Sequence, residues 1–313
     1  MKKVINIILV VIVACGLCIL LYPVISNVIN DYYNTSNIKQ YDNKVKTLSD
    51  NDIDSILAKA EEYNKAVATY SYNNGVANYG DTYKEIINSY DDILNFGNSL
   101  IGYIEIPSIN VYLPIYHGDL DNVLDKGSAH MEGTSFPIGG AGTHAVISAH
   151  SGYPRQKFFD DIDKLKKGDT FSITVLNKIL EYKVTEINIV KPTDTSHTRV
   201  QQGKDLVTLV TCYPYGVNTH RLLVTAERQV NNKVLRQSQK ASYNQNINKL
   251  EISIIPTVLI IFYAIIFLYK IHKNLDNHLL MLYYVDEDKI DLSRGVCPYP
   301  AKWECLKMGC FTI

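Results

Sequence analysis

The sequence lacks an excess of either charge. Its 313 residues include 31 Lys and Arg against 32 Asp and Glu, which gives a formal net charge of −1 at pH 7. Nucleic-acid binders rely on Lys and Arg to neutralise phosphates, so this balance argues against a nucleic-acid partner. The sequence also has no internal repeat and no regular alternation of strand and helix patterns, which argues against a repeat architecture or a parallel α/β sheet.

Cysteine is scarce in the central part of the chain. Of six cysteines, Cys15 and Cys18 lie in an N-terminal apolar run, three lie near the C-terminus, and Cys212 alone lies between them. Without a partner, Cys212 excludes a disulfide scaffold there, and it is either a small buried apolar residue or a reactive thiol. The C-terminal cysteines lack the short CxxC spacing of a zinc site, so we expect no metal and no other cofactor.

Two long runs lack charge and are rich in apolar residues. The first covers residues 4–28 and follows two lysines, and at about 1.5 Å per residue it is long enough to cross a bilayer. The second covers residues 252–269 and ends at Lys270 and Lys273. Lysines mark the cytoplasmic side, so these runs predict a multi-pass cell-membrane protein whose central region is extracellular.

Other interpretations of these runs remain open. A cleaved signal peptide would have a shorter apolar core, and residues 12–16 resemble a lipoprotein box although the chain stays apolar beyond them. The run at 252–269 could be a buried core helix, but it lacks a polar face. We therefore divide the chain into an N-terminal transmembrane segment (1–29), a helical appendage (30–100), a β domain (101–230), a linker (231–251), a second transmembrane helix (252–269) and a cytoplasmic tail (270–313).

The appendage has helical periodicity. Residues 50–70 place apolar side chains at helical spacing, with Ser49 or Asp50 as the N-cap: Ile53, Ile56, Leu57, Ala60 and Tyr63. Glycines and asparagines interrupt the pattern at residues 70–81, and a second helix is expected over 82–94. We expect this appendage to pack on the β domain or to cover part of it.

From residue 101 onward, short apolar runs alternate with turn signals. Strands are expected at residues 103–107, 111–116, 144–149, 171–175, 180–191, 206–211 and 222–226, with a short helix at 157–165 and a glycine-rich connection at 127–142. In the run at 206–211, alternate residues would be buried on both faces. This pattern predicts a mostly β fold, as a closed or nearly closed barrel.

Three reactive side chains lie where expected strands meet loops. Cys212 ends the strand at 206–211, Arg221 begins the next strand, and His150 follows the strand at 144–149. A thiol becomes a nucleophile as thiolate, which requires a base or a nearby positive charge, and a hairpin would bring Arg221 beside Cys212. His150 could equally be a structural histidine and Arg221 a surface arginine.

The motifs around these residues resemble the sortases, the cysteine transpeptidases of Gram-positive surfaces. TLVTC at 208–212 is similar to their TLxTC signature, and the wider blocks resemble the class C branch that polymerises pilins: GYIEIP at 102–107, LPIYHG at 113–118, EGTSFPIGG at 132–140 and GTHAVISAH at 142–150. The resemblance implies an eight-stranded β-barrel, with Cys212 as nucleophile, His150 as general acid and base, and Arg221 stabilising substrate and oxyanion.

The resemblance also implies a substrate class. The partners would be membrane-held pilin subunits with an LPxTG-like sorting signal, cleaved between Thr and Gly, and an acceptor lysine that forms an isopeptide bond. A housekeeping sortase that anchors proteins to peptidoglycan, a secreted cysteine protease and a non-enzymatic surface or pilus component are the alternatives. The Asp-Pro-aromatic lid of class C enzymes is missing, and its nearest approximation is Asp81-Thr82-Tyr83, so Asp81, Tyr83 and the stretch 70–81 are the candidate lid.

Overall fold

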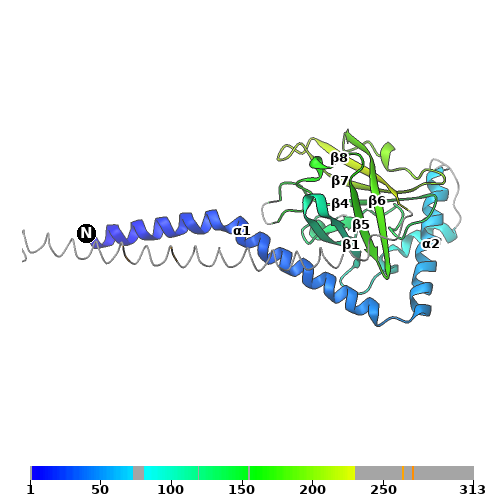
Figure 1. Ribbon diagram of the computed structural model, residues 1–313, viewed down its shortest axis with the longest axis horizontal. Helices are drawn as coiled ribbons and strands as arrows, with labels where there is room; N and C mark the ends of the chain where they lie inside the picture. The colour runs from blue at the N-terminus through cyan, green and yellow to red at the C-terminus, as the bar shows by residue number, and fades with distance from the viewer. Residues whose placement is uncertain are drawn as a thin grey trace, which may run out of the picture. The chain divides into compact units, whose positions relative to one another are not determined.

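The computed structural model describes residues 2–72, 81–118, 120–153 and 156–229, together with Tyr263 and Lys270 (Figure 1). The chain divides into two compact units, one of residues 16–255 and one of residues 1–15 with 256–313. The predicted linker, second span and cytoplasmic tail lie outside the described residues, apart from Tyr263 and Lys270. The β-strands lie in the unit of residues 16–255.

Eight strands close into one barrel with the order β1-β2-β3-β4-β7-β8-β6-β5 (Figure 1). The strands are β1 (Leu100–Ile106), β2 (Val111–His117), β3 (Ser128–His130), β4 (Thr143–Ser148), β5 (Thr170–Val175), β6 (Lys178–Val190), β7 (Asp205–Tyr213) and β8 (His220–Arg228). The pairs β2–β3 and β4–β7 are parallel, and the other neighbours are antiparallel. The predicted eight-stranded, mostly β barrel is confirmed.

Strand β7 is buried on both faces, as its unbroken apolar run predicts. Val207 and Leu209 are fully buried in the barrel core. On the other face, Val210 packs with Val146 of β4 and Leu223 of β8 in a separate small cluster. Because side chains alternate along a strand, Cys212 lies on the same face as Val210, outside the barrel core.

Two parts of the sequence-based assignment were wrong. The glycine-rich connection at 127–142 contains β3, a strand of three residues that is too short to show alternation. The helix expected at 157–165 is absent except for a 3-10 turn, η3 (Ile162–Lys164). The Asp160 carboxylate accepts hydrogen bonds from the backbone N–H groups of Gly152 and Phe158, which holds this segment in turns instead of a helix.

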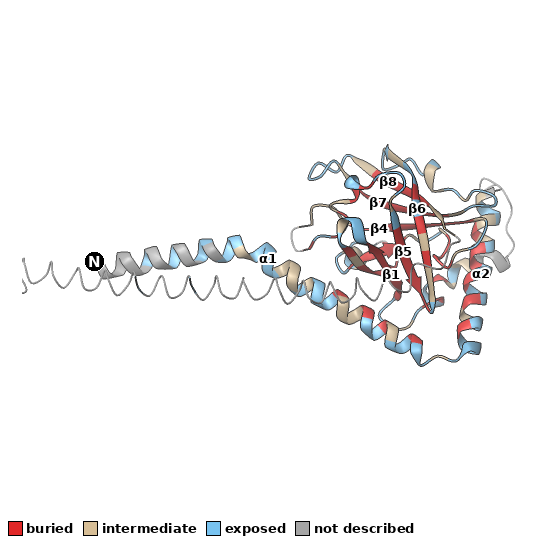
Figure 2. Cartoon of the chain, viewed as in Figure 1, coloured by how far each residue is buried: buried red, intermediate tan, exposed pale blue. Residues whose placement is uncertain are grey.

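The appendage packs against the barrel through α1 (Lys2–Lys46) and α2 (Asp50–Tyr72) (Figure 2). Tyr41 of α1 is 2% exposed, and its hydroxyl donates to the carbonyl of Ile101 at 2.7 Å and accepts from the N–H of Leu176 at 2.8 Å. Such buried, fully paired contacts fix the helix on the strands. The predicted packing of the appendage on the β domain is confirmed.

Helix α2 begins at the predicted cap. The Ser49 hydroxyl accepts from the N–H of Asp52 at 3.2 Å, and the Asp52 carboxylate accepts from the N–H of Ser49 at 3.2 Å, which is a reciprocal capping arrangement. The predicted apolar stripe faces the core: Ile53, Leu57, Ala60 and Tyr63 are buried. The second predicted helix is shorter than expected, because α3 (Asp81–Asn88) is followed by the 3-10 turn η1 (Tyr90–Asp92).

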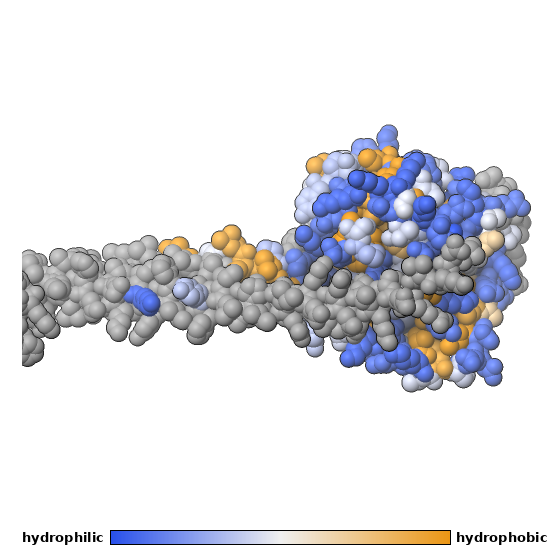
Figure 3. All heavy atoms as spheres, viewed as in Figure 1, coloured by the Kyte–Doolittle hydropathy of each residue, from blue (hydrophilic) through white to orange (hydrophobic). Residues whose placement is uncertain are grey.

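Helix α1 also exposes apolar side chains before it reaches the barrel (Figure 3). Within residues 19–33, eight large apolar residues are more than a third exposed: Ile19, Leu20, Tyr22, Val24, Ile25, Ile29, Tyr32 and Tyr33. Among the residues that the structure describes, no helix has both the length and the apolarity needed to cross a bilayer.

Candidate active site

The β7–β8 hairpin brings Cys212 and Arg221 together. The two residues are direct partners in the antiparallel register, and both are partly exposed. Residues opposite each other in such a pair have Cβ atoms about 4.5–5.5 Å apart and point to the same side of the sheet. The guanidinium of Arg221 therefore belongs to the immediate surroundings of the thiol.

His150 reaches the same end of the barrel from β4, which is the parallel neighbour of β7 on its other side. Ser148 pairs with Val210, so two residues further along each strand His150 lies level with Cys212. The ladder continues in this direction, because the N–H of Ala149 donates to the carbonyl of Val210 at 3.1 Å. The Ser151 hydroxyl then donates to the carbonyl of Cys212 at 2.7 Å. The predicted trio of Cys212, His150 and Arg221 is thus assembled at one end of three adjacent strands.

The imidazole of His150 is held by aromatic rings. The Tyr153 ring stacks on it with centroids 5.3 Å apart and an interplanar angle of 9°, and Phe158 lies at 6.4 Å. The N–H of Phe159 donates to the His150 carbonyl at 2.9 Å, which closes the loop behind the ring. The side chain of His150 keeps 27% of its surface exposed, so a reacting group can approach it.

Arg221 is oriented by backbone carbonyls of its own hairpin. Its Nη1 donates to the carbonyl of Asn218 at 3.3 Å and to that of His220 at 3.0 Å. These contacts use one end of the guanidinium and leave further N–H donors for a ligand, because the group has five in a planar fork. A fixed positive charge next to Cys212 stabilises a thiolate or an oxyanion.

The β7–β8 connection rests on the loop that follows His150. The ring of Tyr215 approaches Gly152, where a Cβ would lie 3.4 Å from the ring, and Gly152 has φ +74°. A side chain at Gly152 would therefore be strained and would crowd Tyr215. Tyr215 and Val217 are 66% and 64% exposed, so the β7–β8 connection presents apolar surface to solvent.

Three other histidines of the β domain are buried and structural. Burial lowers the pKa of His130 to about 3, and burial also lowers the pKa values of His117 and His144. His130 is enclosed by Tyr90, whose hydroxyl lies 3.0 Å from Nδ1, and by the Ser135 carbonyl at 2.8 Å from Nε2. These neutral, enclosed rings cannot exchange protons with a substrate, which favours His150 as the base.

Two carboxylates near His150 were missed by the sequence-based reasoning. Asp125 Oδ1 lies 3.8 Å from His150 Nε2, and Asp160 organises the loop that follows the histidine. Neither residue is part of a recognisable motif or adjacent to His150 in sequence. Register between β3 and β4 is what brings Asp125 close, and that register cannot be read from the residues alone.

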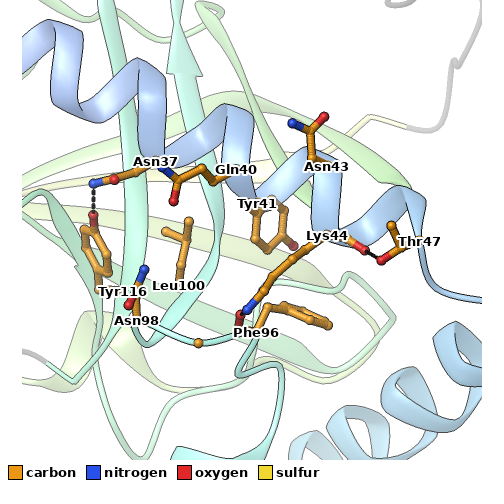
Figure 4. A pocket seen from close by; sticks show the side chains of 11 residues that line it. Asn37, Gln40, Tyr41, Asn43, Lys44, Thr47, Phe96, Asn98, Leu100 and Tyr116 are labelled. Atoms are coloured by element: carbon orange, nitrogen blue, oxygen red, sulfur yellow. Dashed lines mark hydrogen bonds between the residues drawn. The ribbon is translucent and has the colours of Figure 1, made fainter.

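A cavity of about 420 Å³ lies elsewhere, where α1 crosses the start of β1 (Figure 4). Its wall combines amide side chains with aromatic and aliphatic ones, and Asn37 donates to the Tyr116 hydroxyl at 3.1 Å. Lys44 reaches the Phe96 carbonyl across the cavity (Figure 4). None of the three predicted catalytic residues lines this cavity.

Most of the candidate lid lies outside the described residues. Asp81 is the first residue of α3 and Tyr83 the third, and the description does not extend to their side chains or to residues 73–80. The lid therefore stays a prediction. Within the described ranges, no three His, Cys, Asp or Glu side chains cluster as metal ligands would.

Comparison with known proteins identifies the family to which this fold belongs. A model of the sortase domain matches residues 104–229. The crystal structure of sortase C1 from Streptococcus agalactiae is 40% identical, has a TM-score of 0.56, and is matched over 63% of this chain and 100% of that chain. The X-ray structure of Clostridium perfringens sortase C with the C-terminal cell wall sorting motif is 43% identical, with a TM-score of 0.53, over 63% of this chain and 99% of that one. The chain belongs to the sortase family, and these structural neighbours are class C sortases.

Curated relatives match over a shorter region. Sortase D of Bacillus subtilis is 32% identical over 114 residues, which are 36% of this chain and 54% of the relative. Sortase A of Bacillus anthracis is 31% identical over 128 residues, which are 41% of this chain and 59% of the relative. This chain therefore spans little more than half the length of these two relatives.

Proposed function

We propose that this sortase is a membrane-anchored cysteine transpeptidase that joins pilin subunits. It would cleave an LPxTG-like sorting motif between Thr and Gly and transfer the new carboxyl end to a lysine amine of the next subunit. The single observation that supports the chemistry best is the arrangement of Cys212 between Arg221, its partner in the β7–β8 register, and His150 at the end of the parallel strand β4.

In the first half of the reaction, the Cys212 thiolate attacks the carbonyl carbon of the substrate threonine. The negative charge that develops on the carbonyl oxygen is stabilised by the guanidinium of Arg221. The tetrahedral intermediate collapses as protonated His150 gives its proton to the departing glycine amine, and a thioester to Cys212 remains. No metal is required for this step.

In the second half, a lysine amine, and not water, accepts the acyl group from the thioester. The incoming lysine enters as the free amine after its ammonium group has lost one proton to solvent, and neutral His150 removes the second proton from the nitrogen as it attacks the thioester carbonyl. Loss of the Cys212 thiolate then produces an isopeptide bond and regenerates the protonated histidine. The number of protons is conserved over the cycle, because the proton taken from lysine replaces the one given to glycine.

A small apolar cluster supports the site from the outer face of the strands. Val210 and Leu223 lie two residues away from Cys212 and Arg221 on the same face, and Val146 of β4 completes the cluster. Met131 and Val190 pack against its edges. These side chains are already buried, with Val146 0%, Leu223 2% and Val210 9% exposed, so the cluster holds the ends of the three strands in place beneath Cys212 and Arg221.

The membrane setting is part of the same proposal. We expect residues 1–29 and 252–269 to span the cell membrane, with the barrel on the outside, so that it meets pilin subunits held in the same membrane. The exposed tyrosines of α1, Tyr22, Tyr32 and Tyr33, would suit the membrane interface.

The decisive experiment combines the full-length chain with two pilin substrates, one bearing the sorting motif and one bearing the acceptor lysine. Mass spectrometry should find a covalent product in which the threonine carboxyl is joined to the lysine side chain. The product should disappear with Cys212→Ala and when the acceptor lysine is replaced by arginine. Hydrolysis alone, with no amine-dependent product, would instead indicate a protease.

The alternative function is anchoring of surface proteins to peptidoglycan. We retain this alternative because several curated relatives are named sortase A. The chemistry at Cys212 is the same, so only the acceptor separates the two functions. Single proteins joined to a cell-wall peptide amine would support anchoring, whereas ladders of pilin polymers support the main proposal. A non-enzymatic pilus component would give neither product.

A further inference from the structure

Four chemically active groups lie in a row across one end of the barrel. The strand order β3-β4-β7-β8 places Arg221 on β8, Cys212 on β7 and His150 after β4. The connection that leads into β3 supplies the fourth group, Asp125, whose Oδ1 is 3.8 Å from His150 Nε2. In this order the two fixed charges stand at the outer ends, with the carboxylate beside His150 and the guanidinium beside Cys212.

We propose that Asp125 is a positioning residue for His150, and that together with Arg221 it favours the state in which Cys212 is a thiolate and His150 an imidazolium. When the proton moves from sulfur to the ring, the resulting charges alternate along the row as negative, positive, negative and positive. Each new charge then has an opposite neighbour on its outer side, which lowers the free energy of the charge-separated state.

Local structure fixes the position of this carboxylate. The short helix α4 (Asp121–Leu124) ends at Asp125, whose N–H donates to the carbonyl of Asp121 at 2.9 Å. Three residues later β3 begins, and Ala129 pairs with Ser148 of β4. The approach to His150 is thus set by a helix end and a strand register, which hold the backbone of Asp125 in place.

The distance and exposure define the size of the effect. At 3.8 Å the contact is too long for a hydrogen bond, and the side chains are 27% exposed for His150 and 49% exposed for Asp125. The interaction is therefore an ion pair that forms when the ring is protonated and that salt weakens. The other titratable or charged groups at this end of the surrounding elements include Cys212 and Tyr213 on β7, Arg221 and His220 on β8, Lys126 beside Asp125, and Tyr153 and Asp160 on the loop after β4.

Direct titration of His150 tests the inference without using turnover. The full-length chain, labelled at histidine ring carbons and held in detergent micelles, is titrated by NMR, with His150→Gln assigning the signal. In Asp125→Asn the midpoint of the His150 titration should fall by about 0.2 to 0.7 pH unit, the range of exposed ion pairs, and Asp125→Glu should restore much of it. At about 1 M salt the wild-type midpoint should approach that of Asp125→Asn.

A matched control is Asp121→Asn, which removes the same charge from the same short helix, at a residue with no recorded contact to His150. In Asp121→Asn the midpoint of the His150 titration should stay within about 0.1 pH unit of the wild-type midpoint. Superimposable titrations of wild type and Asp125→Asn, at low and at high salt, would overturn the inference. An equal shift in Asp121→Asn would do the same, because it would show a general charge effect.

The consequence for turnover rests on the proposed function. The limb of the pH profile of kcat/KM that belongs to His150 should move in Asp125→Asn by the same amount and in the same direction as the titration. If wild type cleaved no sorting peptide, the proposed function would fail while the titration still decided the role of Asp125. If cleavage occurred but the pH profile of Asp125→Asn were unchanged, the role of Asp125 alone would fail.

Discussion

Acid should destabilise this fold through a histidine that the chemistry does not use. His130 is fully buried, and burial lowers its pKa from the ordinary 6.5 to about 3. Its stabilising contribution is therefore fully present above pH 6.5 and is lost as the pH falls from 6.5 toward 3, because the unfolded chain then binds a proton that the folded chain refuses. Between pH 6.5 and 5 the loss from His130 alone is about 2 kcal/mol, at about 1.36 kcal/mol per pH unit.

Two further histidines act in the same direction. Burial lowers the pKa values of His117 and His144, so these two histidines add to the loss from His130. For a domain whose total stability is about 5–15 kcal/mol, this is a large fraction. Three partly buried carboxyls act in the opposite direction, because burial raises the pKa of Asp31 to about 6 and also raises the pKa values of Asp42 and Asp205, so proton uptake by the folded chain offsets part of the loss.

The assay is urea unfolding of the full-length chain at a series of pH values between 7.5 and 5. Far-ultraviolet circular dichroism monitors the loss of secondary structure. His197→Gln is the matched control, since His197 is partly exposed at the surface, and its curve should follow wild type. NMR titration of the His130 ring gives a second measurement that does not depend on unfolding. A His130 signal that titrates near pH 6.5 in the folded chain would refute the reasoning.

The remaining predictions concern the site and its surroundings. Arg221→Lys should lower kcat for sorting-peptide cleavage by about 10²- to 10³-fold, because a point charge does not reproduce the planar fork, and a loss below fivefold would contradict that role. Asn27→Ala should raise hydrogen exchange at the amide of Lys157 about fivefold, because Asn27 Oδ1 accepts from that N–H at 3.0 Å, and unchanged exchange would show that the contact does not protect the loop. Deleting residues 70–81 should increase peptide cleavage if that stretch is a lid, and an unchanged rate would exclude it.

Strand content was predictable because apolar runs and turn residues mark it locally. Seven of the eight strands were expected from such runs, and β7 showed burial on both faces in its sequence alone. The strand that was missed, β3, has three residues and owes its position to pairing with β2 and β4. The helix expected at 157–165 failed for a related reason, since the side chain of Asp160 binds the backbone N–H groups of Gly152 and Phe158 and so ties the segment to the preceding loop, which periodicity does not reveal.

The site was predictable in part. Cys212 and Arg221 could be placed together because a hairpin returns its second strand beside the first. The proximity of His150 depends on a parallel pairing of β4 with β7 across more than fifty residues, so it rested on the family resemblance rather than on periodicity. The proximity of Asp125 to His150 could not be predicted, because Asp125 lies in no hairpin with the histidine and in no known motif. The pairing register of β3 with β4 brings it close.

The most direct test of the central claim is to trap the thioester on Cys212. The full-length chain is incubated with a sorting-motif peptide, quenched in acid and measured by mass spectrometry. The account predicts an adduct on Cys212 equal to the peptide up to its threonine, which hydroxylamine releases and which Cys212→Ala lacks. Peptide cleavage by Cys212→Ala in the presence of hydroxylamine, or cleavage by wild type with no adduct at any time, would contradict the account.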